Sequence, residues 1–187
     1  MAVLIEALNV LIPVAVLDRR FPGGASAYRD RSPNATFCAD GELTRIGFMT
    51  PRDTQLFTGA LQRLGFEFLD DKGSAVDFVV VDQNTGPTSP CDWLEFGVGN
   101  TMSAAWLRGS SPPGQVFCPD GWEPRETPLT FVPNEELDRM KFLGRSGPSD
   151  RYLDREAGHE TYIGSPFRDG RVPFEDLPNA ALPAESH

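Results

Sequence analysis

Two short segments of the chain carry the same order of a cysteine and an acid. Residues 37–41 read Phe-Cys-Ala-Asp-Gly, and residues 117–121 read Phe-Cys-Pro-Asp-Gly. With Cys91 and His159 they could supply sulfur and nitrogen ligands for zinc, but zinc sites usually take two cysteines from one short stretch. The chain has no such pair, so we expect neither a metal nor a cofactor. The motifs instead fit reverse turns, in which Asp and Gly suit the backbone and the cysteine fills space.

A cysteine nucleophile needs a histidine or a helix N-terminus to lower the pKa of its thiol. The chain has two histidines, His159 and the C-terminal His187, and nothing in the sequence brings either of them to a cysteine. It also lacks the Gly-x-Ser-x-Gly, His-Glu-x-x-His, phosphate-loop and dinucleotide-binding patterns. The sequence therefore contains no catalytic signature, and it leaves open whether the protein is an enzyme.

Polar side chains follow the most apolar strand of the chain. Residues 78–81 are apolar, and polar groups at the end of such a central strand often face a cleft. If residues 92–98 pair with residues 76–82, a small acidic pocket with an aromatic wall would form, suited to a cation, a sugar or an amine. The alternative is that Asp and Asn stand there as turn formers. The candidate binding residues are Asp82, Asn84, Asp92, Trp93 and Glu95.

Acids strongly outnumber bases in this chain. Its 187 residues include 27 Asp and Glu against 17 Lys and Arg, and the formal net charge at pH 7 is −10. Nucleic acids and anionic membranes attract proteins through Lys and Arg, so we expect binding to neither. A basic protein partner or a cation would be attracted instead. The alternative is that the acids serve solubility alone.

The first twenty residues are apolar but do not resemble a targeting segment. Glu6 stands where a secretory signal carries positive charge, and Asn9 and Pro13 interrupt the apolar run. The run is also too short to span a bilayer. Three cysteines without a Cys-x-x-Cys pair are typical of free thiols in a reducing compartment. We therefore expect a cytoplasmic protein.

Local patterns predict several elements of the first half. Residues 3–12 are apolar at nearly every position, which favours one strand buried on both faces. The Asp-Gly pair at 40–41 separates two strand-like runs, as in a two-residue hairpin turn. The Thr-Pro pair at 50–51 is typical of a helix start, and apolar residues then recur at helical spacing. This pattern predicts a long amphipathic helix over 51–64, with Leu56 on its apolar stripe.

The second half repeats the order of turn, strand-like run, capped helix and glycine. After the second motif, residues 127–132 read as a strand, and a helix is expected over 134–143 from apolar residues at every third position. Residues 148–158 could form a further short helix. The shared order could be an eroded duplication, or the same local patterns used twice.

Hairpin signals dominate over strand–helix–strand alternation, so the predicted fold is α+β. We expect an antiparallel or mixed sheet of about six to eight strands, with the helix 51–64 on one face and a few short helices elsewhere. Residues 1–163 should form one domain, with 1–109 and 115–163 as possible halves. Residues 164–187 carry prolines between apolar residues, which favours an extended arm. The arm would dock on its own domain or on a second copy, and a disordered tail is the alternative.

Two function classes follow from these features. The first is an acidic cytoplasmic protein-binding domain, for example an immunity or inhibitor-type protein that neutralises a partner protein. The second is a small enzyme or small-molecule-binding domain that uses the pocket around Asp82, Asp92, Trp93 and Glu95. Salt separates the two, because charge-steered association slows at high ionic strength whereas an enclosed pocket should hardly respond.

Overall fold

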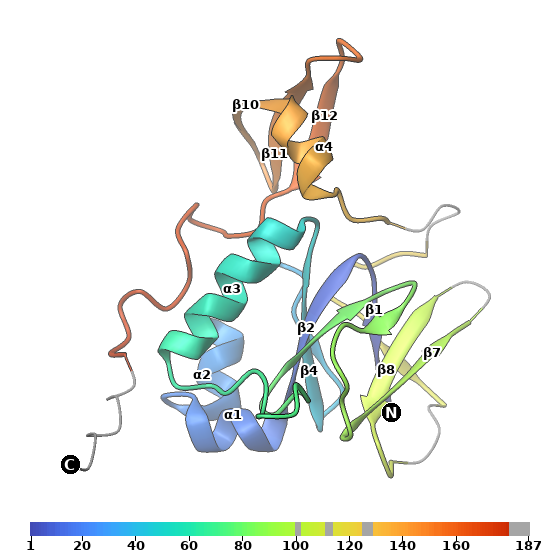
Figure 1. Cartoon of the computed structure of the whole chain (residues 1–187), viewed down its shortest axis with the longest axis vertical. Coiled ribbons are helices and arrows are strands. Elements are labelled where there is room, and N and C mark those ends of the chain that lie inside the picture. The colour runs from blue at the N-terminus through green and yellow to red at the C-terminus, as the bar shows by residue number, and fades with distance from the viewer. Residues whose placement is uncertain (100–101, 111–113, 125–128, 180–187) are drawn as a thin grey trace.

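The computed structural model describes residues 1–99, 102–110, 114–124 and 129–179. Helices and antiparallel or mixed sheets make up the ordered elements of this part of the chain, so the predicted α+β class is confirmed (Figure 1). The described strands form three sheets, whereas the sequence predicted one. The helices are α1 (Val14–Arg20), α2 (Gly24–Asp30), α3 (Pro51–Arg63) and α4 (Asn134–Arg139).

A five-stranded antiparallel sheet lies at the centre of the molecule. Its strands are β2 (Leu8–Pro13), β3 (Cys38–Ala39), β4 (Leu43–Phe48), β5 (Val79–Asp82) and β6 (Gly86–Pro87). Their order is β3-β4-β2-β5-β6. The central strand β2 pairs with β4 on one side and with β5 on the other, so that Val10 lies between Ile46 and Val80.

A second, four-stranded sheet contains the N-terminal strand. Its strands are β1 (Ala2–Ile5), β7 (Leu94–Val98), β8 (Ser103–Leu107) and β9 (Val116–Phe117). Their order is β7-β8-β1-β9. β1 pairs antiparallel with β8 and parallel with β9, which sets Val3 beside Ala105 and Phe117. Chain from both sides of residue 110 therefore joins one sheet.

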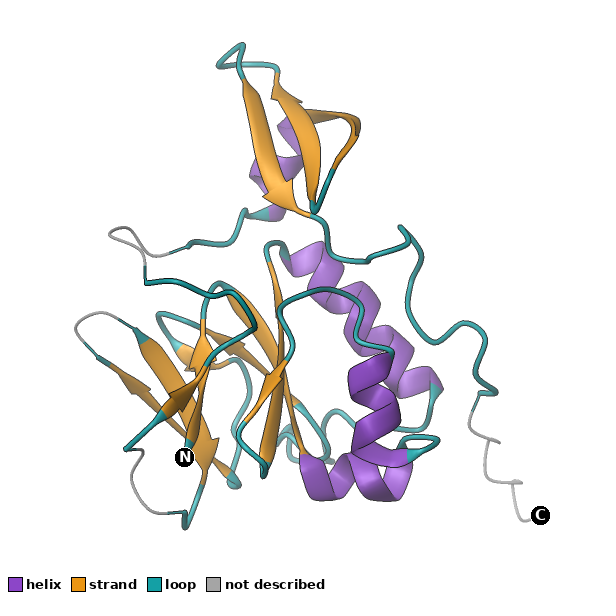
Figure 2. Cartoon of the chain, turned by 180° about the vertical axis from the view of Figure 1, so that it is seen from behind, coloured by secondary structure: helices purple, strands orange, loops and turns teal. Residues whose placement is uncertain are grey.

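Helices α1, α2 and α3 cover one face of the five-stranded sheet, and the four-stranded sheet covers the other (Figures 1 and 2). Successive residues of a strand point to opposite faces, so β2 contributes to both layers. The core under the helices includes Val10, Leu17, Tyr28, Ile46, Phe57, Leu61 and Phe78. The core between the two sheets includes Val3, Ile5, Leu11, Leu43, Val79, Val81 and Ala105.

The predicted single strand over residues 3–12 is wrong, because the chain bends between Ile5 and Leu8 and enters a different sheet. Ala7 has a φ of 53°, in the left-handed region that costs an L-residue about 1–2 kcal/mol. Gln83 holds the bend. Its Oε1 accepts a hydrogen bond from the Ala7 N–H at 2.7 Å, and its own N–H donates to the Ala7 carbonyl at 3.1 Å. The bend joins the two sheets through one continuous segment.

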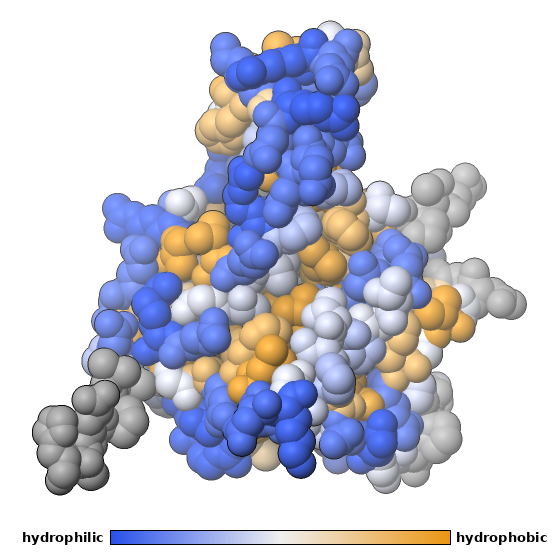
Figure 3. Space-filling model, in the orientation of Figure 1, coloured by the Kyte–Doolittle hydropathy of each residue, from blue (hydrophilic) through white to orange (hydrophobic). Residues whose placement is uncertain are grey.

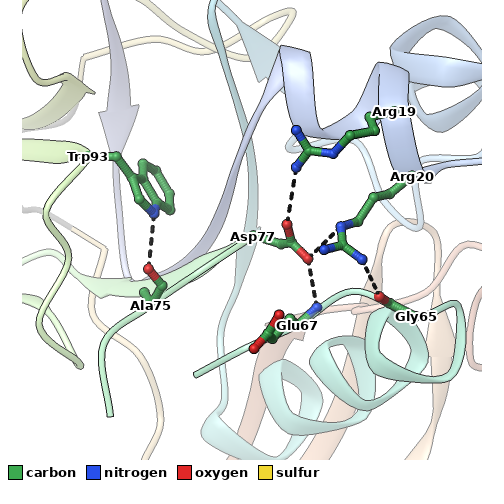
Figure 4. A network of polar contacts seen from close by, with 7 residues as sticks. All are labelled: Arg19, Arg20, Gly65, Glu67, Ala75, Asp77 and Trp93. Atoms are coloured by element: carbon green, nitrogen blue, oxygen red, sulfur yellow. Dashed lines mark hydrogen bonds and ion pairs between the residues drawn. The ribbon is translucent and has the colours of Figure 1, made fainter. Parts of the chain in front are cut away.

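A buried carboxylate ties α1 to the segment that leads into β5 (Figure 4). Asp77 is 1% exposed, and its carboxylate lies 2.8 Å from Arg20 Nε and 3.5 Å from Arg19 Nη2, at the C-terminal end of α1. It also accepts a hydrogen bond from the Glu67 N–H at 2.7 Å, while Arg20 Nη1 donates to the Gly65 carbonyl at 3.0 Å. The buried charge is therefore paired, as its burial requires, and α1 is fixed against the chain after α3.

Helix α3 begins where the sequence predicts. Thr50 is its N-cap, and the Thr50 hydroxyl accepts a hydrogen bond from the Asp53 N–H at 3.1 Å. The helix ends at Arg63, one residue before the predicted end. Leu56 is not on the buried face as predicted, since it is 44% exposed while its neighbour Phe57 faces the core. In the described ranges, no helix combines the length and the apolar character needed to cross a membrane.

The loop at Asp40 is longer than the predicted two-residue turn. β3 ends at Ala39 and β4 begins at Leu43, so three residues connect the two strands. The Asp40 carboxylate accepts hydrogen bonds from the N–H groups of Glu42 and Leu43, at 2.9 and 2.8 Å. This side-chain turn takes the place of the tighter hairpin. The strand register is shifted by two residues from the predicted one, which leaves each side chain on its predicted face.

A small lobe projects from the two-sheet body (Figure 1). After α4 it contains a three-stranded antiparallel sheet of β10 (Met140–Ser146), β11 (Ser149–Asp154) and β12 (Glu160–Gly164). The predicted helix over 134–143 is therefore wrong beyond Arg139, and the predicted helix within 148–158 is a strand and a turn. Met140 and Leu137 pack against Ile163, a long-range contact that the three-residue spacing does not reveal.

Two further predictions touch residues outside the described ranges. Of the predicted strand 127–132, residues 127–128 lie outside them, and residues 129–132 are not a strand. The proposed boundary near residues 110–114 also falls largely outside them. The order of elements shared by the two halves therefore ends at the second motif, because a strand and a long helix do not follow it.

The described part of the C-terminal arm runs beside the helices (Figure 1). It contains turns at residues 168–169 and 173–176, so it is not the continuously extended segment that the sequence predicts. Phe167 and Phe174 are 6% and 7% exposed, and they belong to the same core as Tyr28 and Phe57. The ring centroids of Phe174 and Phe57 lie 5.9 Å apart. These two arm residues are used within the chain rather than offered to a second copy. Residues 180–187 of the predicted arm lie outside the described ranges.

Replacing Gln83 by alanine should lower the free energy of unfolding by about 1–3 kcal/mol, because the buried Ala7 N–H loses its acceptor. Urea denaturation followed by circular dichroism measures the change. Gln55→Ala, on the exposed side of α3, is the matched control and should change stability by less than about 0.5 kcal/mol. Equal effects of the two substitutions would show that Gln83 does not hold the bend.

Candidate functional site

The structure does not pair the two strands that the predicted acidic pocket requires. β5 pairs with β2 and β6 in the five-stranded sheet, whereas β7 pairs with β8 in the four-stranded sheet. The expected pairing of residues 92–98 with 76–82 is therefore wrong, since both sides of β5 are occupied. The pairing is long-range, and the local sequence pattern does not determine it.

Of that predicted pocket, Asp82 ends β5, and Asn84 and Asp92 lie in turns. Asp82 Oδ1 accepts hydrogen bonds from the N–H groups of Asn84, at 2.7 Å, and Thr85, at 3.2 Å. This geometry is the turn-forming alternative. Asn84 and Asp92 are exposed. A role for these three residues in binding a ligand stays a prediction.

The aromatic residue and the glutamate of the predicted pocket bind other parts of the fold. Trp93 Nε1 donates a hydrogen bond to the Ala75 carbonyl at 3.2 Å (Figure 4). Glu95 Oε2 accepts one from Trp106 Nε1 at 2.7 Å, across the β7–β8 pair. These bonds satisfy the indole of Trp93 and one carboxylate oxygen of Glu95 within the molecule. A role for Trp93 and Glu95 in ligand binding likewise stays a prediction.

The two Phe-Cys-x-Asp-Gly motifs lie side by side. Cys38 Sγ is 3.5 Å from the Phe117 carbonyl oxygen, and Cys38 and Cys118 line one groove of about 430 Å³. Cys91 does not line this groove. In the part of the chain that the structure describes, no three His, Cys, Asp or Glu side chains are grouped so that they could hold a metal ion. The motifs bring two turns from different sheets into contact.

The thiols of the chain are weakly acidic. Burial raises the pKa of Cys38 to about 11 and the pKa of Cys91 to about 11. Burial also raises the pKa of Cys118, and the positive charge of Arg45 only partly opposes this effect at Cys38 and Cys118. The thiolate is the nucleophilic form of cysteine, so all three side chains are unreactive near neutral pH.

Arg45 places a positive charge between the two sheets. It belongs to β4 and is 2% exposed. Its Nε donates a hydrogen bond to the Leu4 carbonyl at 2.9 Å, and its Nη1 donates to the Thr36 carbonyl at 2.6 Å. Among the described residues, no acid lies within the 4.0 Å that defines an ion pair with it. Buried charges are usually paired, because an unpaired one is costly.

A cavity of about 200 Å³ opens onto this guanidinium, and we call it the Arg45 pocket. Six separate parts of the chain line it. They are the bend after β1, residues 34–36, the end of β4, the second Phe-Cys-x-Asp-Gly motif, Leu129, and the junction of β12 with the arm. The polar lining includes Glu6, Asn34, Thr36, Arg45, Asp120 and Trp122.

A glycine keeps space beside the guanidinium. A Cβ at Gly47 would lie 3.3 Å from Arg45 Nη2 and 3.4 Å from Asn9 Oδ1. Both contacts are tight, so a larger residue would push against the polar groups at this point. Asn34 Nδ2 donates to the carbonyls of Gly47 and Pro166, at 3.0 and 3.1 Å. The amide therefore ties β4 to the start of the arm and fixes this wall of the pocket.

Several polar atoms at the pocket have unused hydrogen-bonding capacity. Burial lowers the pKa of the Arg45 guanidinium, and the charges of Cys38 and Glu6 oppose that effect. Within the described residues, the buried atoms Trp122 Nε1 and Asn9 Oδ1 have no hydrogen-bond partner. Arg45 Nη2 likewise has none there. Buried polar groups are normally satisfied, so this arrangement is suited to a polar ligand.

A larger groove, of about 670 Å³, lies between the end of α2 and the arm. All the charged residues that line it are exposed, and two of them, Arg31 and Asp176, pair with each other at 2.6 Å. Exposed pairs of this kind contribute little energy, and the groove presents no buried charge to a ligand. The Arg45 pocket is therefore the better candidate site.

Sequence reasoning did not select Arg45. In the strand 43–48, the apolar residues Ile46 and Phe48 lie on the face opposite Arg45, so the local pattern leaves Arg45 on a face that could be solvated. β4 is covered on both faces, however, so a charge on either face is buried. The sequence does contain one indication of this buried charge. Arg45 lies in a strand whose other face is apolar, and a strand that is covered on both faces buries every side chain.

No similarity to a known protein bears on this site. Comparison with protein-family models, with curated proteins and with solved structures gave no match to the chain. The function must therefore be inferred from the charge, the cavity and the unpaired polar atoms around Arg45.

At pH 8, Cys38 in the folded protein should react with iodoacetamide about 100-fold more slowly than in protein unfolded by urea. Burial raises its pKa to about 11, so only a small fraction is thiolate, whereas the unfolded thiol has a pKa near 8.5. Peptide mass spectrometry over time measures both rates. The folded rate should rise with pH towards 11. Equal rates for folded and unfolded protein would contradict the buried position of this thiol.

Proposed function

We propose that the protein binds a small carboxylate-bearing molecule in the Arg45 pocket. One observation supports this above all. The guanidinium is 2% exposed and lines a cavity, and none of the described acids lies within ion-pair distance of it. Guanidinium groups hold carboxylates with charge-assisted N–H bonds, and a ligand carboxylate would supply the missing countercharge.

The dimensions of the pocket suit a small ligand. Its volume of about 200 Å³ lies below the roughly 300–1,000 Å³ of sites for drug-sized molecules. Trp122 supplies an aromatic wall and an indole N–H without a described partner. Asn34 and Thr36 line the same cavity, and their side chains bond to each other and to the backbone of Gly47. A few placed polar groups on an otherwise packed surface are typical of a specific binding site.

The chemistry of the pocket favours binding over catalysis. The neighbouring thiols of Cys38 and Cys118 have raised pKa values, so neither is an activated nucleophile. This proposal belongs to the small-molecule class that the sequence suggested, but it uses Arg45 in place of the acidic residues expected there. The ligand is accordingly an anion at the point of contact and not a cation.

The proposal can be tested by NMR titration of the folded protein with pairs of carboxylates and their uncharged amides. Adding propionate or 4-methylpentanoate should shift the indole N–H resonance of Trp122, because a bound carboxylate accepts its hydrogen bond. Propionamide and 4-methylpentanamide should not. The indoles of Trp93 and Trp106 already donate within the protein, so they are internal controls. Trp122→Phe assigns the responsive signal.

Two substitutions give the test a sharper outcome. Arg45→Gln should weaken carboxylate binding about 100-fold, since it removes a buried charged donor. If this variant does not fold, Trp122→Phe, whose change is confined to the wall, should still weaken binding about tenfold. The backbone N–H resonance of Gly47, which also lines the pocket, reports binding in this variant. The proposal fails if amides and carboxylates shift the spectrum equally, or if neither substitution changes the affinity.

We keep the acidic protein-binding domain, of immunity or inhibitor type, as a second proposal. Among the described residues, the buried charged side chains are three acids and one arginine, so most of the negative excess lies on the surface. The projecting lobe is mainly hydrophilic on the face seen in Figure 3. Two of its aromatic residues, Phe142 and Tyr162, are nevertheless 56% and 57% exposed. Exposed aromatic residues within a polar surface are suited to a protein partner.

For that second proposal, association with a purified basic partner should slow about tenfold between 0.05 and about 0.5 M salt, because screening removes the steering. Stopped-flow fluorescence measures the rate. Phe142→Ala should instead raise the dissociation rate, since it removes contact area without changing charge. An association rate independent of salt would rule out a charge-steered partner.

A further inference from the structure

The Arg45 pocket holds two opposite charges that do not touch. Glu6 and Arg45 both line it, and their charges influence each other. They are nevertheless farther apart than the 4.0 Å of an ion pair. None of the described residues donates a hydrogen bond to the Glu6 carboxylate either. One cavity of about 200 Å³ is thus lined by an arginine and a glutamate, neither of which is paired with a described group of opposite charge.

We infer that the ligand is a zwitterion of α-amino-acid type, with its carboxylate on Arg45 and its ammonium group towards Glu6. The inference rests on the proposed function and narrows its ligand class. A carboxylate alone would satisfy Arg45 and leave Glu6 beside a second negative charge. An ammonium group two bonds from the carboxylate carbon would reach towards the opposite side and compensate Glu6 as well.

The surrounding groups agree with this orientation. Trp122 Nε1 is a donor without a described partner, so it favours the carboxylate end of the ligand. Asp120 is exposed, and it lines the same cavity and adds a further negative charge there. A dicarboxylate would place its second charge against these acids, whereas an ammonium group would be attracted by them. The pocket should therefore discriminate by the charge of the ligand as well as by its size.

Matched ligands test the inference with the same NMR titration. L-Leucine differs from 4-methylpentanoate by one ammonium group, and leucinamide lacks the carboxylate of leucine. Leucine should bind at least about tenfold more tightly than either, because each relative lacks one of the two charged contacts. Comparing the affinities of L-alanine and propionate repeats this test with a smaller side chain. Succinate, a dicarboxylate of similar length, should bind most weakly of all.

A charge-matched pair of variants identifies the group that recognises the ammonium. Glu6→Gln should abolish the advantage of leucine over 4-methylpentanoate while leaving the affinity for 4-methylpentanoate within about twofold or improving it. Asp71→Asn changes the net charge of the protein by the same amount at an exposed position outside the pocket. It should leave the ratio of the two affinities unchanged.

The outcomes separate this inference from the proposed function. If 4-methylpentanoate binds and leucine binds no better, the carboxylate site stands and the zwitterion is excluded. If Glu6→Gln and Asp71→Asn alter the ratio equally, the preference comes from the bulk charge and the assignment of Glu6 is overturned. If no carboxylate shifts the Trp122 indole, both the proposed function and this inference fall.

Discussion

The fold depends on one strained residue and the side chain that holds it. The apolar segment at the N-terminus must serve two sheets, and it does so by bending at Ala7, whose φ is 53°. Strain of this kind persists only where the surroundings enforce it. Gln83 enforces it from the end of β5, through hydrogen bonds to both the N–H and the carbonyl of Ala7, and Ser103 from the other sheet donates to the Gln83 carbonyl at 2.7 Å. One buried glutamine thus links the bend, the end of β5 and the start of β8.

The Arg45 pocket is a consequence of this bend. At this bend the chain passes from one sheet to the other, and polar side chains bind backbone groups on both sides of it. The Leu4 carbonyl accepts the Arg45 side chain, and the Asn9 side chain donates to the Glu6 carbonyl at 2.9 Å. Polar side chains therefore satisfy these backbone groups. Arg45 thus reaches from β4 of one sheet to the Leu4 carbonyl in β1 of the other.

The sequence predicts elements that depend on neighbouring residues, but it does not predict which distant strands pair. The Thr50 cap and the end of α3 follow from neighbouring residues, so they were predicted to within one residue. The bend at Ala7 was missed because an unbroken apolar run shows no period that marks a change of sheet. Met140 was placed in a helix for a related reason, since its true partner, Ile163, is far away in the chain. The predicted pocket around Asp82 requires residues 92–98 to pair with residues 76–82, and local sequence patterns do not determine such a long-range pairing.

The bulk charge and the charge of the pocket have opposite signs, and this difference bears on the ligand. A net charge of −10 repels any anion that approaches the protein, most of all at low ionic strength. The buried Arg45 attracts a carboxylate only at short range, inside the cavity. A zwitterion has no net charge, so the negative charge of the protein does not repel it during its approach. Inside the pocket, its carboxylate and its ammonium group can each contact a different residue. The acidic surface and the buried cation are therefore compatible with one ligand class, although each taken alone would suggest a different one.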